Sequence, residues 1–358
     1  MSRTIDKYNP WLHRFAVMTA GATLLLICLG GVVTSKGVGM SVPDWPTTYG
    51  YNMFFFPFSK WVGGIFYEHS HRLLASAVGF LTILLAVWLW WKDGRRWMRW
   101  LGIAAVISVC LQGVLGGLRV TQLKDELGIF HAALAQLIFV LLSAIALFCS
   151  RWWLDTARTQ VAASQAPSRW YWLGTGLIFV QLILGATMRH QHAGLAISDF
   201  PLAHHQIWPA VDSTSIAHYN QERIETSAVN PITALQVLLQ MVHRITAVLI
   251  LLVVIWTARV THGRFGWKGA LTKLSLLWSG LILSQVALGA ATIWTNKSAD
   301  IATAHVAAGA LSLMTGAMVL LVAHRSLEPL AAAARVPQSV EKGSTEVKPK
   351  AGEFVMPA

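Results

Sequence analysis

Four histidines occupy matching places in the two halves of this hydrophobic chain. His71 and His131 lie in the first half, and His243 and His305 lie in the second. An imidazole inside a membrane is costly unless it has a partner or a metal, and imidazole is a common axial ligand of heme iron. The doubled pattern therefore predicts two paired metal or heme sites, one in each half. For any single membrane histidine, the alternative is a hydrogen bond to a neighbouring helix.

The composition indicates that membrane helices must position these side chains. Of the 358 residues, 55% are hydrophobic and 12% are charged, and the mean hydropathy is +0.53. A helix needs roughly 20 apolar residues to cross the hydrocarbon core. Eight stretches qualify and leave almost no soluble domain, so an all-α membrane protein with eight transmembrane helices is predicted. The stretches are about 15–34, 71–91, 100–118, 128–149, 170–188, 234–256, 274–294 and 302–323.

The distribution of lysine and arginine predicts the orientation, because cationic loops are retained on the cytoplasmic side. Nineteen of these residues lie in the two terminal segments and in the loops after the second, fourth and sixth spans. Both termini are therefore expected to be cytoplasmic, and the net charge of +12 reflects topology and anionic lipid rather than nucleic acid. Only seven lie in the remaining loops: Lys36, Lys60, Arg119, Lys124, Arg189, Arg223 and Lys297.

No cleavable signal or transit segment is expected at the amino terminus. The amino terminus runs into the first apolar stretch without a small-residue cleavage pattern, and it lacks an Arg-rich and Ser-rich transit segment. A bacterial cytoplasmic membrane is therefore favoured over a mitochondrial one. Cys28, Cys110 and Cys149 fall within predicted helices, so no disulfide framework is expected. Residues 326–358 are expected to form a disordered cytoplasmic tail.

The two halves of the chain repeat when one is laid over the other. An even number of helices in each half gives both halves the same orientation, as expected for a pseudo-two-fold axis along the membrane normal. The repeat predicts two four-helix bundles, 1–155 and 156–325. The matched landmarks are Leu29-Gly30 with Leu184-Gly185, Asp44-Trp45-Pro46 with Asp199-Phe200-Pro201, Glu68 with Gln240, His71-Arg72 with His243-Arg244, Gln112 with Gln285, and His131 with His305.

The second, fourth, sixth and eighth predicted spans all begin on the outer side of the membrane. This places the four histidines toward that face. They fall in the first turns of the predicted helices, or near the third turn for His243. Within each half, the two histidines should project from two helices toward a shared bundle interior, where bundles build their cofactor sites.

The repeat also indicates which half carries out chemistry. Glu68 in the first half is replaced by Gln240 in the second, a nearly isosteric change that removes an acid. Glu68 and His71 share a helix face, and a carboxyl group in a low-dielectric pocket can exchange protons. Glu68 is therefore a candidate catalytic residue. The alternative roles are a salt bridge to Arg72 or a favourable position at the helix N-terminus.

These residues resemble the heme A synthases, membrane enzymes that convert heme O to heme A for terminal oxidases. The likeness extends to about Ala323. It implies two pseudosymmetric four-helix bundles, a heme b between His243 and His305, substrate heme O between His71 and His131, and an essential glutamate at Glu68. The motifs that carry it are Gly30-Gly31-Val32-Val33-Thr34, Pro43-Asp44-Trp45-Pro46, Glu68-x-x-His71-Arg72, Gln112-x-x-x-Gly116-Gly117 and the three later histidines.

The resemblance implies successive oxidation of one porphyrin methyl to a hydroxymethyl and then to a hydrated aldehyde, which loses water to give the formyl group. Two histidines saturate the iron, whereas oxygen activation requires an exchangeable position. Either His71 or His131 dissociates during turnover, or the methyl is oxidised by electron removal and trapped by water while Glu68 takes a proton. Heme b would relay electrons from an unidentified donor. A heme O synthase and terminal oxidase assembly factors are the implied partners.

Other polar residues support weaker assignments. Arg72 and Arg244 each follow a histidine and either bind heme propionates as cofactor-binding residues or extend to the outer interface. Residues 35–67 contain no cysteine, so the chain looks like the cysteine-free branch of the family. A metal site is not expected in the second outer loop, because its histidines lack a compact ligand spacing. These are His190, His192, His204, His205 and His218.

Two functions of other classes are considered beside the enzyme. A non-enzymatic di-heme b-type electron-transfer cytochrome would use similar histidine pairs, but electron transfer across the membrane favours two depths, whereas both pairs are predicted at one depth. A repeat-built transporter would place polar residues at the midplane and gives no reason for four histidines near one face.

Overall fold

The computed structural model describes residues 8–155, 167–223 and 231–325, and this part of the chain is helical without a strand. Eight of its helices are long and apolar enough to cross a membrane, so the prediction of an eight-span, multi-pass membrane protein is confirmed. The predicted tail, 326–358, lies outside the described residues. The spans are α1 Pro10–Ser35, α2 Gly63–Lys92, α3 Arg96–Gln122, α4 Asp125–Phe148, α6 Ser168–His190, α8 Ala234–Phe265, α9 Ala270–Trp294 and α10 Ala299–Arg325.

Capping residues explain where two of the spans begin. Asn9 accepts hydrogen bonds from the backbone N–H groups of Trp11 and Leu12, and Pro10 occupies the first turn of α1. Thr233 and Gln236 form a reciprocal capping box at the start of α8. Such caps satisfy backbone donors that a helix start leaves without an intrahelical partner.

Most spans are longer than the apolar stretches of the sequence. The largest difference at a helix start is in α2, which begins at Gly63 rather than near His71. Glu68 and His69 lie before the apolar stretch and are polar. Both residues nevertheless belong to the helix, and their side chains are buried. A loop covers both side chains, and the hydropathy pattern of a helix does not reveal a contact of this kind.

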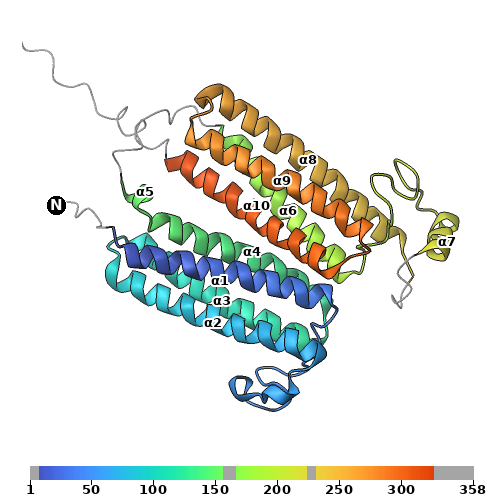
Figure 1. Ribbon diagram of the computed structural model, residues 1–358, viewed down its shortest axis with the longest axis horizontal. Helices are drawn as coiled ribbons and strands as arrows, with labels where there is room; N and C mark the ends of the chain where they lie inside the picture. Colours follow the sequence, from blue (N-terminus) through green and yellow to red (C-terminus); the bar gives the residue numbers. More distant parts are fainter. Residues whose placement is uncertain (1–7, 156–166, 224–230, 326–358) are drawn as a thin grey trace, which may run out of the picture.

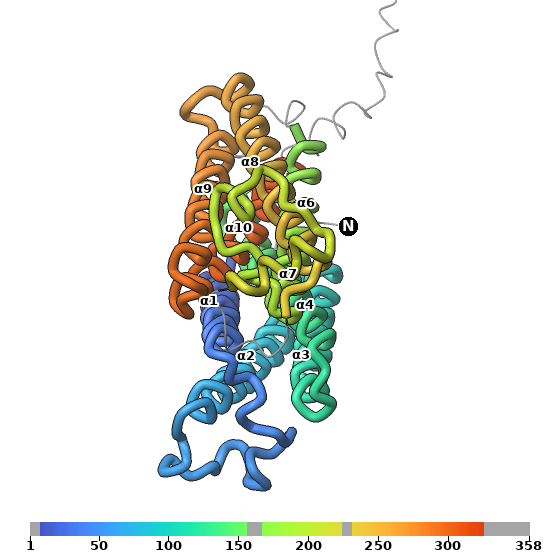
Figure 2. Tube along the Cα trace, turned by 90° about the vertical axis from the view of Figure 1, so that its right-hand side faces the viewer, coloured from blue at the N-terminus to red at the C-terminus, as the bar shows by residue number. Residues whose placement is uncertain are grey.

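The eight spans pack as two rings of four. In the first ring α1 contacts α2 and α4, and α3 closes it between them; in the second, α6 contacts α8 and α10, and α9 closes it (Figure 1). The rings meet where α1 packs on α10 and α4 packs on both α6 and α10. Viewed along the helices, the two rings lie one above the other (Figure 2).

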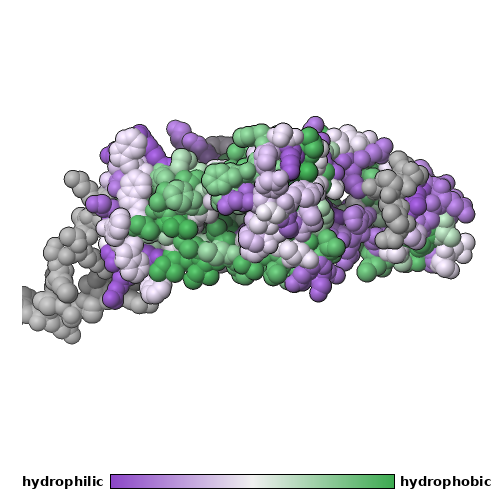
Figure 3. Space-filling view, turned by 90° about the horizontal axis from the view of Figure 1, so that it is seen from below, coloured by the Kyte–Doolittle hydropathy of each residue, from purple (hydrophilic) through white to green (hydrophobic). Residues whose placement is uncertain are grey.

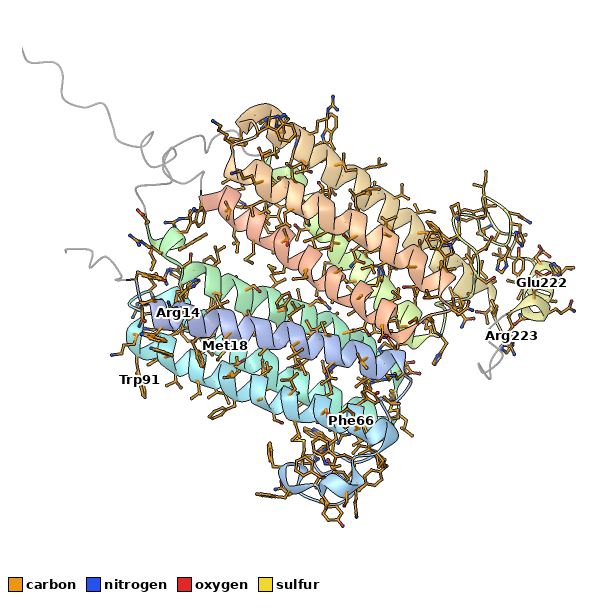
Figure 4. The ribbon with its side chains drawn as sticks, in the orientation of Figure 1. Arg14, Met18, Phe66, Trp91, Glu222 and Arg223 are labelled. Atoms are coloured by element: carbon orange, nitrogen blue, oxygen red, sulfur yellow. The ribbon has the colours of Figure 1, made fainter. Side chains whose placement is uncertain are left out.

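The two ends of the helices differ. One end, here called the loop end, carries loop 36–62 and segment 191–223, which contains α7 Ser213–Glu222. Loop 36–62 contains the short 3-10 helices η1 Met53–Phe55 and η2 Phe58–Lys60. Phe66 lies at this end, and Glu222 and Arg223 lie beyond it on α7 and its exit, whereas Arg14 and Trp91 lie at the opposite end (Figure 4). In the space-filling view, hydrophobic residues gather in a central zone and hydrophilic ones toward the ends (Figure 3).

Large apolar side chains fill each bundle at the end away from the loops. Leu89 and Met98 in the first ring are completely buried there. In the second ring Trp278 is completely buried between Gly174 and Gly316, and its indole donates to the carbonyl of Ser312 at 2.9 Å. These side chains fill the bundle interiors at the end opposite the loops. The histidine pairs lie in the other half of each bundle.

Candidate functional site

The four histidines lie within spans, in the half nearer the loop end. His71 and His243 occupy the third turns of α2 and α8, whereas His131 and His305 occupy the second turns of α4 and α10. The predicted turn is confirmed for His243. The first-turn placement is wrong for the other three, because their helices begin several residues before the predicted apolar stretches do.

In each ring the two histidines come from helices that lie diagonally across the bundle. The first pair belongs to α2 and α4, which are separated by α1 and α3, and the second pair to α8 and α10, which are separated by α6 and α9. Each pair is close enough to interact electrostatically: His71 with His131, and His243 with His305. The predicted pairing within each half therefore matches the helix arrangement.

Each imidazole packs against a glycine of the preceding span. A Cβ at Gly30 would lie 3.1 Å from Cε1 of His71, and one at Gly116 would lie 3.1 Å from Cε1 of His131. These distances are shorter than ordinary van der Waals contact, so a methyl group would push the ring aside. Glycine therefore sets the position of both rings in the first bundle.

The second bundle repeats this contact. A Cβ at Gly185 would lie 3.3 Å from Cε1 of His243, and one at Gly289 would lie 3.3 Å from Cε1 of His305. Gly30 and Gly185 are one of the matched landmarks of the sequence repeat. The same side-chain arrangement thus occurs in both halves.

Glutamines fasten three of the four histidine backbones. In each case a side-chain amide on a neighbouring helix donates to the histidine carbonyl, which draws the two helices together beside the ring. The bonds are Gln112 to His131 at 2.9 Å, Gln181 to His243 at 2.9 Å and Gln285 to His305 at 2.8 Å.

The imidazoles themselves lack protein partners. None of their ring nitrogens is hydrogen-bonded within the described parts of the chain, and all four Nδ1 atoms are buried. A buried polar atom without a partner costs about 1–3 kcal/mol, so such rings are retained for a ligand more readily than for packing. Two neutral imidazoles facing one bundle interior fit the axial ligands of a heme iron, and each half could hold one heme in this way.

Glu68 is buried beside the first histidine pair, with 3% of its surface exposed. Its Oε2 accepts from the backbone N–H of Val42 at 2.9 Å, and its Oε1 accepts from Arg72 at 2.8 Å. The salt bridge to Arg72, one of the alternative roles that the sequence suggested, is therefore present. It keeps an ionisable carboxyl group inside the protein, on the helix that carries His71.

Gln240 occupies the matching place in the second half without a charge. Its Oε1 accepts from the backbone N–H of Ile197 at 2.8 Å, and its Nε2 donates to the carbonyl of Ile197 at 3.1 Å. Val42 and Ile197 are themselves related by the 155-residue offset of the repeat. The contact with the loop is thus conserved between the halves, whereas the acid is present only in the first.

Arg72 and Arg244 bind the loops that cover the histidines. Arg72 donates to the carbonyls of Val42 at 2.7 Å and Asp44 at 2.6 Å. Arg244 donates to the carbonyls of Asp199 at 2.7 Å and Leu202 at 2.8 Å. A contact of either guanidinium with a heme propionate stays a prediction, and fastening of the loops is the role that the described contacts give them.

Asp44 and Asp199 each organise one of these loops. Asp44 accepts from the N–H groups of Tyr49 at 2.7 Å and Gly50 at 2.9 Å; Asp199 accepts from those of His204 at 2.7 Å and His205 at 2.8 Å. Burial raises the pKa of Asp44 and Asp199, but hydrogen bonds to the carboxylates outweigh it, so both pKa values lie below the ordinary value. Both carboxylates are therefore ionised at neutral pH and hold the loops closed.

Two other histidines of the loop end have protein partners. His69 packs beneath loop 36–62 and lies 3.2 Å from the hydroxyl of Thr48, which agrees with a role other than ligand. His204 stacks on Tyr219 with ring centroids 3.5 Å apart. Burial lowers the pKa of His204 despite the hydrogen bond to the carbonyl of Ala196. Among the described residues, no group of three or more His, Cys, Asp or Glu side chains is arranged to hold a metal ion.

Two arginines that the sequence placed in outer loops lie in helices instead. Arg119 is in the last turn of α3, and Arg189 is in the last turn of α6. Arg189 crosses between the rings and donates to the carbonyl of Gly31 at 3.1 Å and the hydroxyl of Ser35 at 2.8 Å on α1. Arg119 lies within electrostatic range of both His71 and His131.

An alignment of the two halves of the sequence would have identified both arginines. Arg119 matches Thr292, and Arg189 matches Thr34. Each threonine bonds only the preceding turn of its own helix, through the carbonyls of Leu288 and Gly30. A basic residue that replaces threonine in one copy alone marks a function specific to that half, as Glu68 does.

Comparison with known proteins agrees with this arrangement. Residues 13–318 match the COX15-CtaA model, described as a cytochrome oxidase assembly protein, and the chain belongs to this family. It is 28% identical over 301 residues to the heme A synthase of Shouchella clausii, covering 80% of this chain and 88% of that protein. The heme A synthase of Alkalihalophilus pseudofirmus is 27% identical over 319 residues, covering 85% and 96%. That of Rhizorhabdus wittichii is 30% identical over 261 residues, covering 69% and 68%.

Proposed function

We propose that this protein is a heme A synthase, an oxidoreductase that oxidises one methyl group of heme O through successive hydroxylations to the formyl group of heme A. Its family membership and its relatives named heme A synthase support this function. The observation that carries it is the set of four imidazoles, two in each bundle, whose buried Nδ1 atoms have no hydrogen-bond partner among the described residues. Heme A made in this way would serve the biogenesis of a terminal oxidase.

The two bundles have different roles in this proposal. Residues 1–155 form the bundle that binds the substrate heme O at His71 and His131, and residues 156–325 form the bundle that holds a heme b at His243 and His305. Bound heme b supplies one-electron transfer. The presence of an acid beside the first pair alone, at Glu68, supports chemistry in the first bundle.

Glu68 is the proton acceptor in this proposal. Oxidation of a methyl group releases protons, and a carboxylate within a bundle interior can take them. Arg72 donates to Oε1 of Glu68 at 2.8 Å and holds the carboxyl group in place on α2. Its bond to the N–H of Val42 fixes the carboxylate beneath loop 36–62. That loop, fastened by Arg72, excludes water from the histidines and thereby protects reactive substrate.

The orientation in the membrane follows from charge. The loop end faces outward and both termini face the cytoplasm of a bacterial cell, because the basic residues concentrate at the opposite end. A pseudo-two-fold axis along the membrane normal relates the bundles, and both heme sites lie toward the outer face. The absence of cysteine from residues 35–67 assigns the chain to the cysteine-free branch, so its mechanism uses no thiol in that loop.

The reaction also defines the partners. A heme O synthase supplies the substrate, a terminal oxidase or its assembly factors receive the product, and a separate donor supplies electrons.

Analysis of the bound hemes tests the proposal. The purified protein is extracted, and its hemes are separated by chromatography and identified by their pyridine hemochrome spectra. A heme A synthase contains heme O, heme A or the hydroxylated intermediate in addition to heme b. Two tightly retained b-type hemes and no other would instead indicate a di-heme electron-transfer cytochrome.

A further inference from the structure

Arg119, in the last turn of α3, is a half-buried cation near the two histidines of the first bundle. It lies one turn after Gly116, the residue that packs on His131, and it is within electrostatic range of His71, His131 and Glu68. Glu68 is already paired with Arg72 at 2.8 Å, so its charge is balanced elsewhere. Asp125 of α4 is also within electrostatic range of Arg119, but no carboxylate of the described residues lies within 4.0 Å of its guanidinium. Arg119 therefore adds a positive charge to this part of the first bundle without a direct ion pair among those residues.

The guanidinium of Arg119 has no bonding partner within the described residues. Its Nε is buried without a hydrogen bond, and neither Nη atom donates to a described group or lies within 4.0 Å of a described carboxylate. Arg72 and Arg189, by contrast, each donate to protein oxygens. Within the described residues, the half-buried guanidinium of Arg119 thus keeps its hydrogen-bonding capacity open.

The covering loop is shaped to admit this side chain. A Cβ at Gly39 would lie 3.0 Å from Nη1 and 3.5 Å from Nη2 of Arg119, so only a glycine lets loop 36–62 approach the guanidinium this closely. The loop presses on the guanidinium without supplying an acceptor. A cation held in that way, in a low-dielectric interior, requires an anion to offset the cost of its desolvation.

We propose that Arg119 binds a propionate carboxylate of the porphyrin held by His71 and His131. This inference rests on the proposed function, because it takes the occupant of the first bundle to be a heme. A guanidinium offers two parallel N–H groups that match the two oxygens of a carboxylate. Heme propionates are the carboxylates that such an occupant carries, and Arg119 fixes which edge of the macrocycle faces the loop end.

The second bundle has no such residue at the matching place. Thr292 stands there and donates to the carbonyl of Leu288 at 2.8 Å, so it is already satisfied within α9. Arg119 therefore orients the substrate porphyrin only. A reaction on one particular methyl group needs a defined rotation of the ring about its iron, and an electron-relay heme does not.

Titration with two porphyrins that differ only in their carboxylates tests the role. The full-length protein is titrated with iron protoporphyrin IX and with its dimethyl ester, and the Soret absorbance gives the affinity of each site. The variants are Arg119→Gln, Arg119→Lys and Lys124→Gln, the last removing an exposed cation at the same end of the bundle. Parallel titrations in a His243→Ala/His305→Ala background, checked for helix content, read the first site alone.

We expect Arg119→Gln to weaken binding of the free acid at one of the two sites by at least about tenfold, because charge-assisted hydrogen bonds are lost. The dimethyl ester should bind Arg119→Gln and the unaltered protein about equally. Arg119→Lys should fall between them, since lysine keeps the charge but not the paired geometry. Lys124→Gln should match the unaltered protein.

Two results would overturn the inference, and they are distinguishable. If the unaltered protein binds both porphyrins and Arg119→Gln binds them undiminished, or loses both equally, Arg119 has no carboxylate to bind and the proposed function stands. If the unaltered protein binds neither porphyrin, the proposed function fails and the inference fails with it.

Discussion

The carboxylate of Glu68 and the guanidinium of Arg72 lie 2.8 Å apart, one helical turn from each other and almost fully buried. The ion pair also connects the proposed catalytic residue to the loop that covers the site. Glu68 accepts from Val42 of loop 36–62, and Arg72 donates to carbonyls of the same loop. A change in the charge of Glu68 would therefore act on both the histidine pair and the loop above it.

Replacement of Glu68 with glutamine separates its charge from its packing, because the second half already carries Gln240 at the matching place. The glutamine can still accept from the N–H of Val42, so Glu68→Gln should fold and bind heme. Heme A formation should fall by about 100-fold or more, which is the usual contribution of a general acid or base. The ratio of heme O to heme A extracted from cells measures this effect. The reciprocal variant, Gln240→Glu, is the control, and a normal rate in Glu68→Gln would contradict the assignment.

Removal of Arg72 should be more damaging than removal of the whole pair. Arg72→Gln leaves a buried carboxylate without its partner, which costs about 3–5 kcal/mol. In the double variant Glu68→Gln/Arg72→Gln no charge is stranded, so the loss should be smaller than the sum of the single losses by about 1 kcal/mol or more. Thermal unfolding in one detergent measures all four proteins. Strictly additive losses would show that the two side chains do not interact in the membrane protein.

The glycines beside the histidines should control heme binding one bundle at a time. Gly116→Ala places a methyl group 3.1 Å from the ring of His131 and should weaken the first site by about tenfold. Gly289→Ala should do the same in the second bundle. Gly113→Ala and Gly280→Ala are matched controls on the same two helices, because nothing lies within 4 Å of a Cβ at either position. Heme titration should distinguish each variant from its control, and equal affinities would exclude this packing.

The loop over the first site should open only in acid. The hydrogen bonds to the Asp44 carboxylate outweigh its burial and lower its pKa, so the ionised form stabilises the folded loop above the ordinary pKa of about 3.9. That stabilisation is lost as the pH falls through the lowered pKa. The protection of the Tyr49 and Gly50 amides against exchange, relative to the intrinsic rate at each pH, should be high at neutral pH and should fall below about pH 4. Asp44→Asn should exchange faster at neutral pH, and unchanged exchange in that variant would refute the role of the carboxylate.

The features that depend on local sequence patterns or on the repeat could be predicted. The eight spans follow from runs of apolar residues, and the pairing of His71 with His131 follows from their places in a repeat. The start of α2 was missed because Glu68 and His69 are polar yet buried. Their cover is a loop whose fold depends on contacts far along the chain, and no periodicity of α2 encodes it.

The partners of the arginines could not be predicted for the same reason. Arg72 donates to carbonyls about thirty residues earlier, and any residue type supplies a carbonyl, so no motif marks these acceptors. Arg119 and Arg189 were assigned to loops because charge ends an apolar stretch. Comparison of the two halves position by position, which distinguished Glu68 from Gln240, would have singled them out as well.

The central claim is that each bundle holds its own heme between two histidines. Heme content and optical spectra of the purified protein, of His71→Ala and of His243→Ala test it most directly. The account predicts that His71→Ala loses heme O and its products but keeps heme b, and that His243→Ala loses heme b while its first bundle still binds added porphyrin. Loss of the same heme from both variants, or a protein that stays colourless after reconstitution with iron porphyrin, would contradict it.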